Sequence, residues 1–262
     1  MQIEGKVVVV TGGGHGIGAA MCRRFAEEGA AHVVVSDIDA DAARAVAHKL
    51  EGLAVPCDVS SEAEVQNLVQ QTLAKYGRID IFCSNAGITV KGGIETPDDD
   101  WQSLWNVNLM SRVYAVRVVI PHMLERGSGC IIHTASGAGV LTEIGSAAYS
   151  VTKHADVALA EWLAVRYGRE GIEVSCVCPL GVATDFLDHD DPIHQFLHAT
   201  SVTPEDVAGS VVDGIRDGRF LILPHPEVEE FFAWKTQDYD KWISGMQRLR
   251  QKLTRMKKKK AA

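Results

Sequence analysis

The sequence predicts an α/β fold built on a doubly wound parallel sheet. Short apolar runs rich in β-branched residues alternate with longer segments whose apolar residues recur every three to four positions. This alternation is typical of βαβ units, whose right-handed crossovers place helices on both faces of a parallel sheet. The run Val7–Val10 is apolar throughout, as expected for a strand that is covered on both faces.

The predicted strands lie between positions 1 and 224, a range that we predict to form one domain because no repeat, low-complexity segment or linker interrupts it. They are residues 6–11, 32–37, 53–57, 79–84, 130–135, 173–178 and 220–223. Residues 227–256 are rich in aromatic side chains and read as one or two helices. We therefore expect 225–262 to be a helical extension packed on the same or a neighbouring subunit, ending in a disordered basic tail at 257–260.

Composition and charge narrow the function classes. The 262 residues are 46% hydrophobic and 23% charged, with a net charge of −8, which argues against nucleic-acid binding by the whole protein. Residues 248–262 hold eight Lys or Arg and no acidic residue. We interpret this segment as a solvated tail, with contact to an anionic lipid or RNA surface as the alternative.

The six cysteines are scattered, with no CxxC pair, and predict reduced core thiols in a cytoplasmic protein. We see neither a secretory signal pattern nor an apolar stretch long enough to span a bilayer, so no membrane partner is expected. The acidic and histidine residues at 189–198 lack the spacing of a compact metal motif, and we expect no metal site there. A polar lid is the interpretation that we favour for this segment.

A glycine-rich segment, Thr11–Gly18, joins the first strand to a helix. Glycines allow a tight turn and a close backbone approach to a pyrophosphate, which the N–H groups of the helix N-terminus can then bind. Two registers fit: Gly14, Gly16 and Ala19, or Gly12, Gly16 and Gly18. We prefer the second, because Gly12 directly follows the strand.

The second strand ends at Asp37, downstream of Gly18 by about the spacing that dinucleotide-binding folds show between the glycine loop and their ribose-binding acid. A carboxylate there can accept hydrogen bonds from a ribose 2′-hydroxyl and would repel a 2′-phosphate. No Arg or Lys lies in 12–18 or 36–40 to offset that repulsion, and His15 is largely neutral at pH 7. The pattern predicts NAD rather than NADP as the cofactor.

Three residues in the second half of the domain suit hydride-transfer chemistry. Ser136 follows the fifth predicted strand, and Tyr149 and Lys153 come later in the chain, one helical turn apart on one face. A nearby ammonium lowers the pKa of a phenol, which can then exchange a proton with an alcohol. A serine hydroxyl can hold the substrate oxygen through a hydrogen bond.

The chain resembles the short-chain dehydrogenase/reductase family over about residues 5–224. The matching motifs are Thr11–Gly18, Asp58-Val59, Asn85-Ala86-Gly87, Asn108, Ser136, Tyr149/Lys153 and Pro179–Thr184. The resemblance implies a single Rossmann-type domain with a seven-stranded parallel sheet, and an oxidoreductase that forms a homodimer or homotetramer. It also implies that the substrate is a small-molecule alcohol or ketone.

The resemblance implies roles for individual residues. Tyr149 would be the acid/base, Lys153 would bind the nicotinamide ribose and tune Tyr149, and Ser136 would orient the substrate oxygen. Asn108 would support a water-linked proton relay to Lys153. The cofactor contacts implied are Gly12, His15, Gly16, Ile17, Gly18, Asp37, Asp58, Val59, Asn85, Tyr149, Lys153, Val182 and Thr184.

The chain departs from the family pattern at Ser84, where asparagine is usual, and at Pro179-Leu180-Gly181, where Pro-Gly is usual. The second departure weakens the roles implied for Val182 and Thr184. Two other function classes stay open: an NADPH-dependent carbonyl reductase, which Asp37 opposes, and a non-catalytic NAD-binding protein, which the set of four catalytic-type residues opposes.

Overall fold

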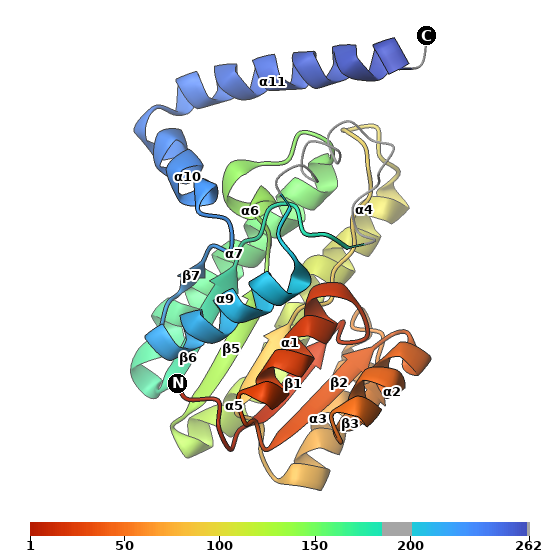
Figure 1. Cartoon of the computed structure of the whole chain (residues 1–262), viewed down its shortest axis with the longest axis vertical. Coiled ribbons are helices and arrows are strands. Elements are labelled where there is room, and N and C mark those ends of the chain that lie inside the picture. The colour runs from red at the N-terminus through yellow and green to blue at the C-terminus, as the bar shows by residue number, and fades with distance from the viewer. Residues whose placement is uncertain (185–200, 261–262) are drawn as a thin grey trace.

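The apolar runs between positions 1 and 224 form seven parallel strands of one sheet in the computed structural model (Figure 1). The structure describes residues 1–184 and 201–260. The strands are β1 (Val7–Thr11), β2 (His32–Asp37), β3 (Leu53–Pro56), β4 (Ile81–Ser84), β5 (Gly129–Thr134), β6 (Ile172–Val177) and β7 (Leu221–Ile222). Each lies close to its predicted range, because strand propensity and apolar pattern are local properties of the chain.

The strand order is β3-β2-β1-β4-β5-β6-β7, which confirms the doubly wound sheet. The chain moves outward from β1 to β3, then returns to place β4 on the other side of β1 and moves outward to β7. Connections on the two sides of this switch point leave a crevice at the carboxyl ends of β1 and β4, where open α/β sheets bind ligands.

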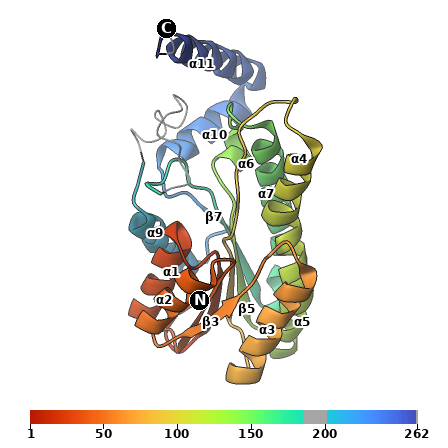
Figure 2. The same ribbon diagram turned by 90° about the vertical axis from the view of Figure 1, so that its right-hand side faces the viewer.

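Helices cover both faces of the sheet, as Figure 2 shows from the side. One layer holds α1 (Gly16–Glu27), α2 (Ala40–Lys49) and α9 (Pro204–Asp217), and the other holds α3 (Glu62–Tyr76), α5 (Ser111–Arg126) and α7 (Ala147–Tyr167). Alternate residues of β1 pack on opposite faces of the sheet. Val8 and Val10 pack in the core under α1, α2 and α9, and Val9 packs in the core under α3, α5 and α7. This is the two-residue period of a strand buried on both faces.

Shorter elements shape the carboxyl edge of the sheet. They are α4 (Asp98–Trp105), the π-helix η1 (Asn106–Met110) and α6 (Ala138–Leu141). The 3₁₀-helix η2 (Gly168–Glu170) lies at the opposite edge, where it joins α7 to the start of β6. η1 joins α4 to α5 without a break in the helical path and carries Asn108. Single π-turns inside helices occur frequently at functional sites.

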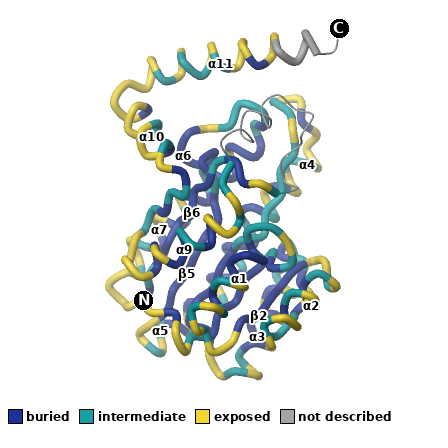
Figure 3. Tube along the Cα trace, in the orientation of Figure 1, coloured by how far each residue is buried: buried dark blue, intermediate teal, exposed yellow. Residues whose placement is uncertain are grey.

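The residues after β7 form two helices, α10 (Glu227–Gln237) and α11 (Tyr239–Lys260), which lie beyond the carboxyl ends of the strands (Figures 1 and 3). α11 includes Lys257–Lys260, for which the sequence predicts a disordered tail. The disorder of this tail stays a prediction.

All six cysteines are free thiols buried in the fold, as predicted. Cys176 and Cys178 share a face of β6 and its extension, with their Sγ atoms 3.9 Å apart. In the part of the chain that the structure describes, no helix is both long and apolar enough to span a membrane. The predicted lid residues at 189–198 lie outside the described residues.

Candidate active site

A cleft of about 1370 Å³ opens at the carboxyl ends of the strands, beside the switch point between β1 and β4. It brings together every residue predicted from the sequence to bind cofactor or substrate, with the exception of Asn108. These residues are Gly12, His15, Gly16, Ile17, Gly18, Asp37, Asp58, Val59, Asn85, Ser136, Tyr149, Lys153, Val182 and Thr184.

The glycine loop requires glycine at the positions of the preferred register. Gly12 has a φ of 63°, in the left-handed region that favours glycine. A Cβ on Gly18 would lie 1.9 Å from the carbonyl oxygen of Gly12, so no larger residue fits without moving the backbone. The structure therefore favours the register Gly12, Gly16, Gly18 over the register that ends at Ala19.

The N-terminus of α1 faces the cleft. Residue His15 caps it without a side-chain hydrogen bond to the helix, and its ring lies 3.2 Å from Asp39 Oδ2 at the surface. No acidic residue occupies the first turn. The first N–H groups of the helix and its dipole are thus available to a phosphate, which this loop is shaped to approach.

Asp37 is held in place at the end of β2. Its Oδ2 accepts a hydrogen bond from the Gly14 N–H (2.9 Å), and its Oδ1 accepts one from the Asp39 N–H (3.0 Å). The carboxylate is 8% exposed and lines the cleft. A carboxylate fixed in this position suits the ribose hydroxyls of NAD and opposes a 2′-phosphate.

Asn85 ties the end of β4 to the glycine loop. Its Nδ2 donates to the carbonyl oxygens of Thr11 (3.1 Å) and Gly12 (3.3 Å). Thr11 Oγ1 also accepts hydrogen bonds from the Asn85 and Ala86 N–H groups. These contacts hold the loops on the two sides of the switch point against each other, so Asn85 supports the floor of the cleft.

Tyr149 and Lys153 lie on the first turns of α7, where the Ser146 side chain caps the helix by accepting a hydrogen bond from the Tyr149 N–H. The Lys153 Nζ lies 5.7 Å from the centre of the Tyr149 ring. Ser136 stands across from them in the loop after β5, with its Oγ fixed by the Ala138 N–H at 3.1 Å. The three side chains thus meet in one part of the cleft.

The pKa of Tyr149 in the structure differs from the value that the sequence predicts. Burial raises the pKa of Tyr149 above its usual range, and hydrogen bonding with Ser136 opposes that rise. The sequence predicted a pKa lowered by Lys153. In the structure the Lys153 Nζ instead donates to the Thr134 carbonyl oxygen (2.9 Å), directed toward the strand end. Burial lowers the pKa of Lys153 to about 8.

Asn108 lies behind the wall of the cleft, fully buried in η1. Its Oδ1 accepts from the Ile88 N–H (2.9 Å), and its Nδ2 donates to the Ile88 carbonyl (2.9 Å) and Thr152 Oγ1 (3.2 Å). These bonds link η1 to the loop after β4 and to α7, which carries Lys153. Its participation in a water-linked relay stays a prediction.

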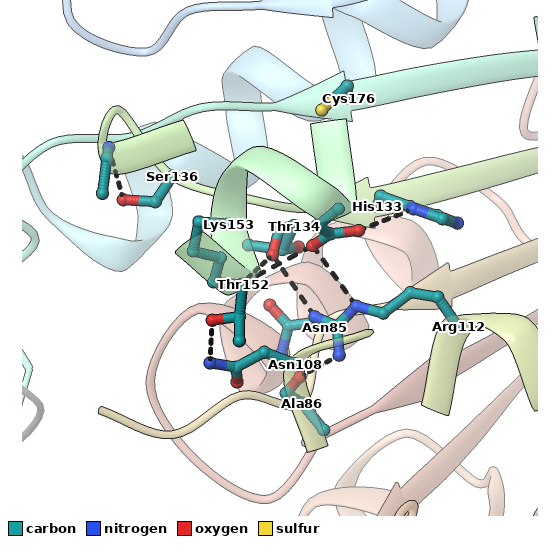
Figure 4. A network of polar contacts seen from close by, with 12 residues as sticks. Asn85, Ala86, Asn108, Arg112, His133, Thr134, Ser136, Thr152, Lys153 and Cys176 are labelled. Carbon is teal, nitrogen blue, oxygen red and sulfur yellow. Dashed lines mark hydrogen bonds and ion pairs between the residues drawn. The ribbon is translucent and has the colours of Figure 1, made fainter. Parts of the chain in front are cut away.

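A buried ionic network below Lys153 was not found by the sequence analysis (Figure 4). Asp156 accepts from or pairs with three side chains: its Oδ1 lies 2.8 Å from His133 Nδ1, and its Oδ2 lies 3.3 Å from Arg112 Nε and 3.7 Å from Lys153 Nζ. Arg112, His133 and Asp156 are 0% exposed. The spacing of Lys153 and Asp156, i and i+3 on one helix, was the available signal.

Comparisons with known proteins place the chain among related sequences. Residues 6–192 match the family model described as short chain dehydrogenase. The chain is 38% identical to a meso-2,3-butanediol dehydrogenase of Serratia marcescens over 249 residues, covering 94% of this chain and 92% of that protein. It is 42% identical over 192 residues to a (21S)-21-acetoxyl-apo-melianone synthase of Melia azedarach, covering 70% and 69%.

Solved structures show the same architecture. A short-chain dehydrogenase/reductase from Burkholderia phymatum in complex with NAD superposes with a TM-score of 0.84 at 29% identity, covering 92% of this chain and 96% of that one. A 7α-hydroxysteroid dehydrogenase in complex with NADH and 7-oxo glycochenodeoxycholic acid gives a TM-score of 0.77 at 28% identity, covering 85% and 93%.

Proposed function

The chain belongs to the short-chain dehydrogenase family, and we propose that it transfers a hydride between NAD(H) and a secondary alcohol or ketone. One observation carries the proposal: Ser136, Tyr149 and Lys153 line the same cleft as the glycine loop and Asp37. A binding-only protein would need the loop and the carboxylate, but it would have no use for a phenol, an ammonium and a hydroxyl gathered beside them.

The cleft residues fit a nicotinamide dinucleotide. The free N–H groups at the start of α1 suit a pyrophosphate, and Asp37, held by the Gly14 N–H, is proposed to bind a ribose diol. Asp58 and Val59 are proposed to flank the adenine, and Val182 and Thr184 to contact the carboxamide. When bound, the nicotinamide supplies the acceptor or donor of the hydride.

The side chains of this protein are proposed to transfer the proton of the substrate oxygen. Tyr149 Oη takes the proton of the alcohol oxygen during oxidation and returns it during reduction. Ser136 Oγ holds that oxygen by a hydrogen bond. Lys153, as an ammonium, favours the phenolate form of Tyr149 and binds a ribose hydroxyl, and Asn108 keeps α7 and η1 in register for this purpose.

The NADPH-dependent carbonyl reductase is the competing proposal, and the Asp37 carboxylate opposes it. Titration of intrinsic tryptophan fluorescence should show at least about tenfold tighter binding of NADH than of NADPH, since the fixed carboxylate repels a 2′-phosphate. Asp37→Asn should narrow this ratio, while Asp41→Asn, at an exposed surface pair, should leave it unchanged. Equal or tighter NADPH binding by the unaltered protein would overturn the NAD assignment.

A homodimer or homotetramer is also proposed, with α7 at an interface. Val151, Trp162 and Val165 of this helix are 47%, 58% and 86% exposed, an apolar surface that a second copy could cover. Light scattering at micromolar concentration should give a mass of at least twice 28.4 kDa. A monomer would contradict the proposal.

The remaining proposals concern location and partners. The six free thiols support a cytoplasmic protein, because such thiols persist in a reducing compartment. The partner proposed is a small-molecule substrate rather than a nucleic acid or a membrane. Unchanged mobility of the protein in the presence of RNA or anionic vesicles would agree with that, and co-migration would contradict it.

A further inference from the structure

α11 has one apolar face. Trp242, Met246, Leu249 and Leu253 recur at spacings of four, three and four positions, which places them along a single stripe of the helix. Leu253 is 5% exposed, whereas residues on the other sides of the helix, such as Gln247 and Gln251, are exposed. The stripe is therefore turned toward the body of the protein.

This apolar stripe lines the same cleft as the reactive side chains. Trp242, Met246 and Leu249 belong to its wall together with Ser136 and Tyr149. Apolar residues of the domain form other parts of the wall, among them Ile88, Leu141, Ile144 and Leu180. The cofactor residues, in contrast, gather around the glycine loop and β2. Among the described residues, the part of the cleft beyond Tyr149 is thus bounded by these apolar side chains together with the charged Glu143, Asp238, Lys241 and Arg248.

α10 holds α11 in this position. The Phe231 ring of α10 lies 5.7 Å from the Trp234 ring and 6.5 Å from the Trp242 ring of α11, measured between ring centres. The buried Lys235 Nζ donates to the Val140 carbonyl oxygen of α6 (2.6 Å), which fixes α10 to the loop region that follows Ser136.

The positive charge of Arg250 on α11 acts on the loop after β4. The pKa of Glu95 in that loop is lowered, first by the hydrogen bond from the Gly93 N–H and to a smaller extent by the positive charge of Arg250. Arg250 therefore lies within electrostatic range of Glu95. Figure 1 shows α11 running from α10 across the carboxyl-end side of the molecule, toward the side that carries the β4–α4 connection.

We infer that α10 and α11 form the substrate-side wall of the active site, and that the substrate is a bulky, largely apolar secondary alcohol or ketone. The inference rests on the proposed hydride transfer and adds the substrate class. A small polar alcohol would leave this apolar wall in contact with water, whereas a fused-ring or long hydrocarbon skeleton would displace that water. The cleft volume of about 1370 Å³ accommodates such a skeleton beside a dinucleotide.

The test compares decahydronaphthol with isopropanol as substrates, with NAD in excess. The unaltered protein should oxidise decahydronaphthol with a kcat/KM at least about tenfold higher, because each buried methylene adds apolar contact in the transition state as well as in the complex. In Leu249→Ala the ratio of the two kcat/KM values should fall about tenfold, since the loss acts mainly on the larger substrate. Gln251→Ala, on the exposed side of α11, should keep the ratio.

A binding measurement makes the test independent of how well the variants fold. The protein with NADH bound should bind decalone at least about tenfold more tightly than acetone, observed as quenching of tryptophan fluorescence. A preference for isopropanol and acetone would overturn the inference, as would a ratio that Leu249→Ala leaves unchanged. Failure to oxidise or reduce any of these compounds with either nicotinamide cofactor would contradict the proposed function itself.

Discussion

The Asp156 Oδ2 atom lies 3.7 Å from Lys153 Nζ and 3.3 Å from Arg112 Nε, so two buried cations share one carboxylate. Burial and the Arg112 charge lower the pKa of Lys153, and Asp156 opposes both, which leaves the pKa at about 8. The ammonium that the proposed chemistry requires is therefore maintained near neutral pH with the help of a side chain that does not face the cleft.

Replacing Asp156 by Asn should move the pH profile of ketone reduction. Without the carboxylate the pKa of Lys153 falls below about 8, so the alkaline decline of kcat/KM should begin at lower pH. The variant should also lose stability, by about 3–5 kcal/mol, because Arg112 is left as an uncompensated buried charge. The measurement is kcat/KM for decalone with NADH between pH 6 and pH 9.

Asp213→Asn provides the control, since Asp213 is 68% exposed and its pair with Arg216 lies at the surface. That variant should keep the profile of the unaltered protein. If Asp156→Asn only lowered the amplitude of the profile without moving it, Asp156 would have a structural role and no influence on the protonation of Lys153.

Lys153→Met should raise the free energy of unfolding at pH 7 by about 1–2 kcal/mol. The folded pKa of Lys153 is lowered from 10.5 to about 8, so between these values the unfolded chain binds more protons and stability rises with pH. Below pH 8 the folded protein carries the full cost of the buried ammonium, which methionine removes. The advantage of the variant should shrink from pH 8 to pH 10.5.

Chemical denaturation at a series of pH values measures this difference. Lys49→Met, at an exposed position near the end of α2, should show no such pH dependence. A Lys153→Met variant that is less stable at every pH would show that the hydrogen bond to Thr134 outweighs the cost of burying the charge.

Tyr149→Phe should reduce kcat by about 10²–10⁴-fold, the usual contribution of a positioned acid or base. Its NADH affinity should stay within a few-fold, because the lost hydroxyl acts chiefly in the transition state. Tyr114→Phe on α5, outside the residues that line the cleft, is the matched control and should keep its activity. Comparable turnover by both variants would assign the proton transfer to another group.

Gly18→Ala should weaken NADH binding and lower the melting temperature, because the new Cβ would lie 1.9 Å from the Gly12 carbonyl oxygen and 2.6 Å from Asn85 Nδ2. Gly209 on α9 has no atom within 4 Å of the equivalent Cβ position. Alanine there should stabilise the protein by about 0.5–1 kcal/mol, through the higher helix propensity of alanine. Calorimetry and NADH titration of the two variants check the contrast.

The sequence by itself determined the strands, their parallel arrangement and the location of the cofactor loop. These follow from local properties: a run such as Val7–Val10 is apolar at every position, and the glycines of Thr11–Gly18 permit a backbone that other residues cannot adopt. The helical spacing of Tyr149 and Lys153 likewise placed both side chains on one face before any tertiary contact was known.

The tertiary structure alone decided which distant side chains meet. Asp156, Arg112 and His133 come from α7, α5 and β5, and their pairing depends on how the helices pack on the sheet, which no local pattern encodes. The burial that raises the pKa of Tyr149 and the hydrogen bond that directs Lys153 toward Thr134 also arise from the tertiary packing. The position of α11 over the cleft depends on contacts of α10 with α6, because an amphipathic stripe indicates that a helix is covered but not what covers it.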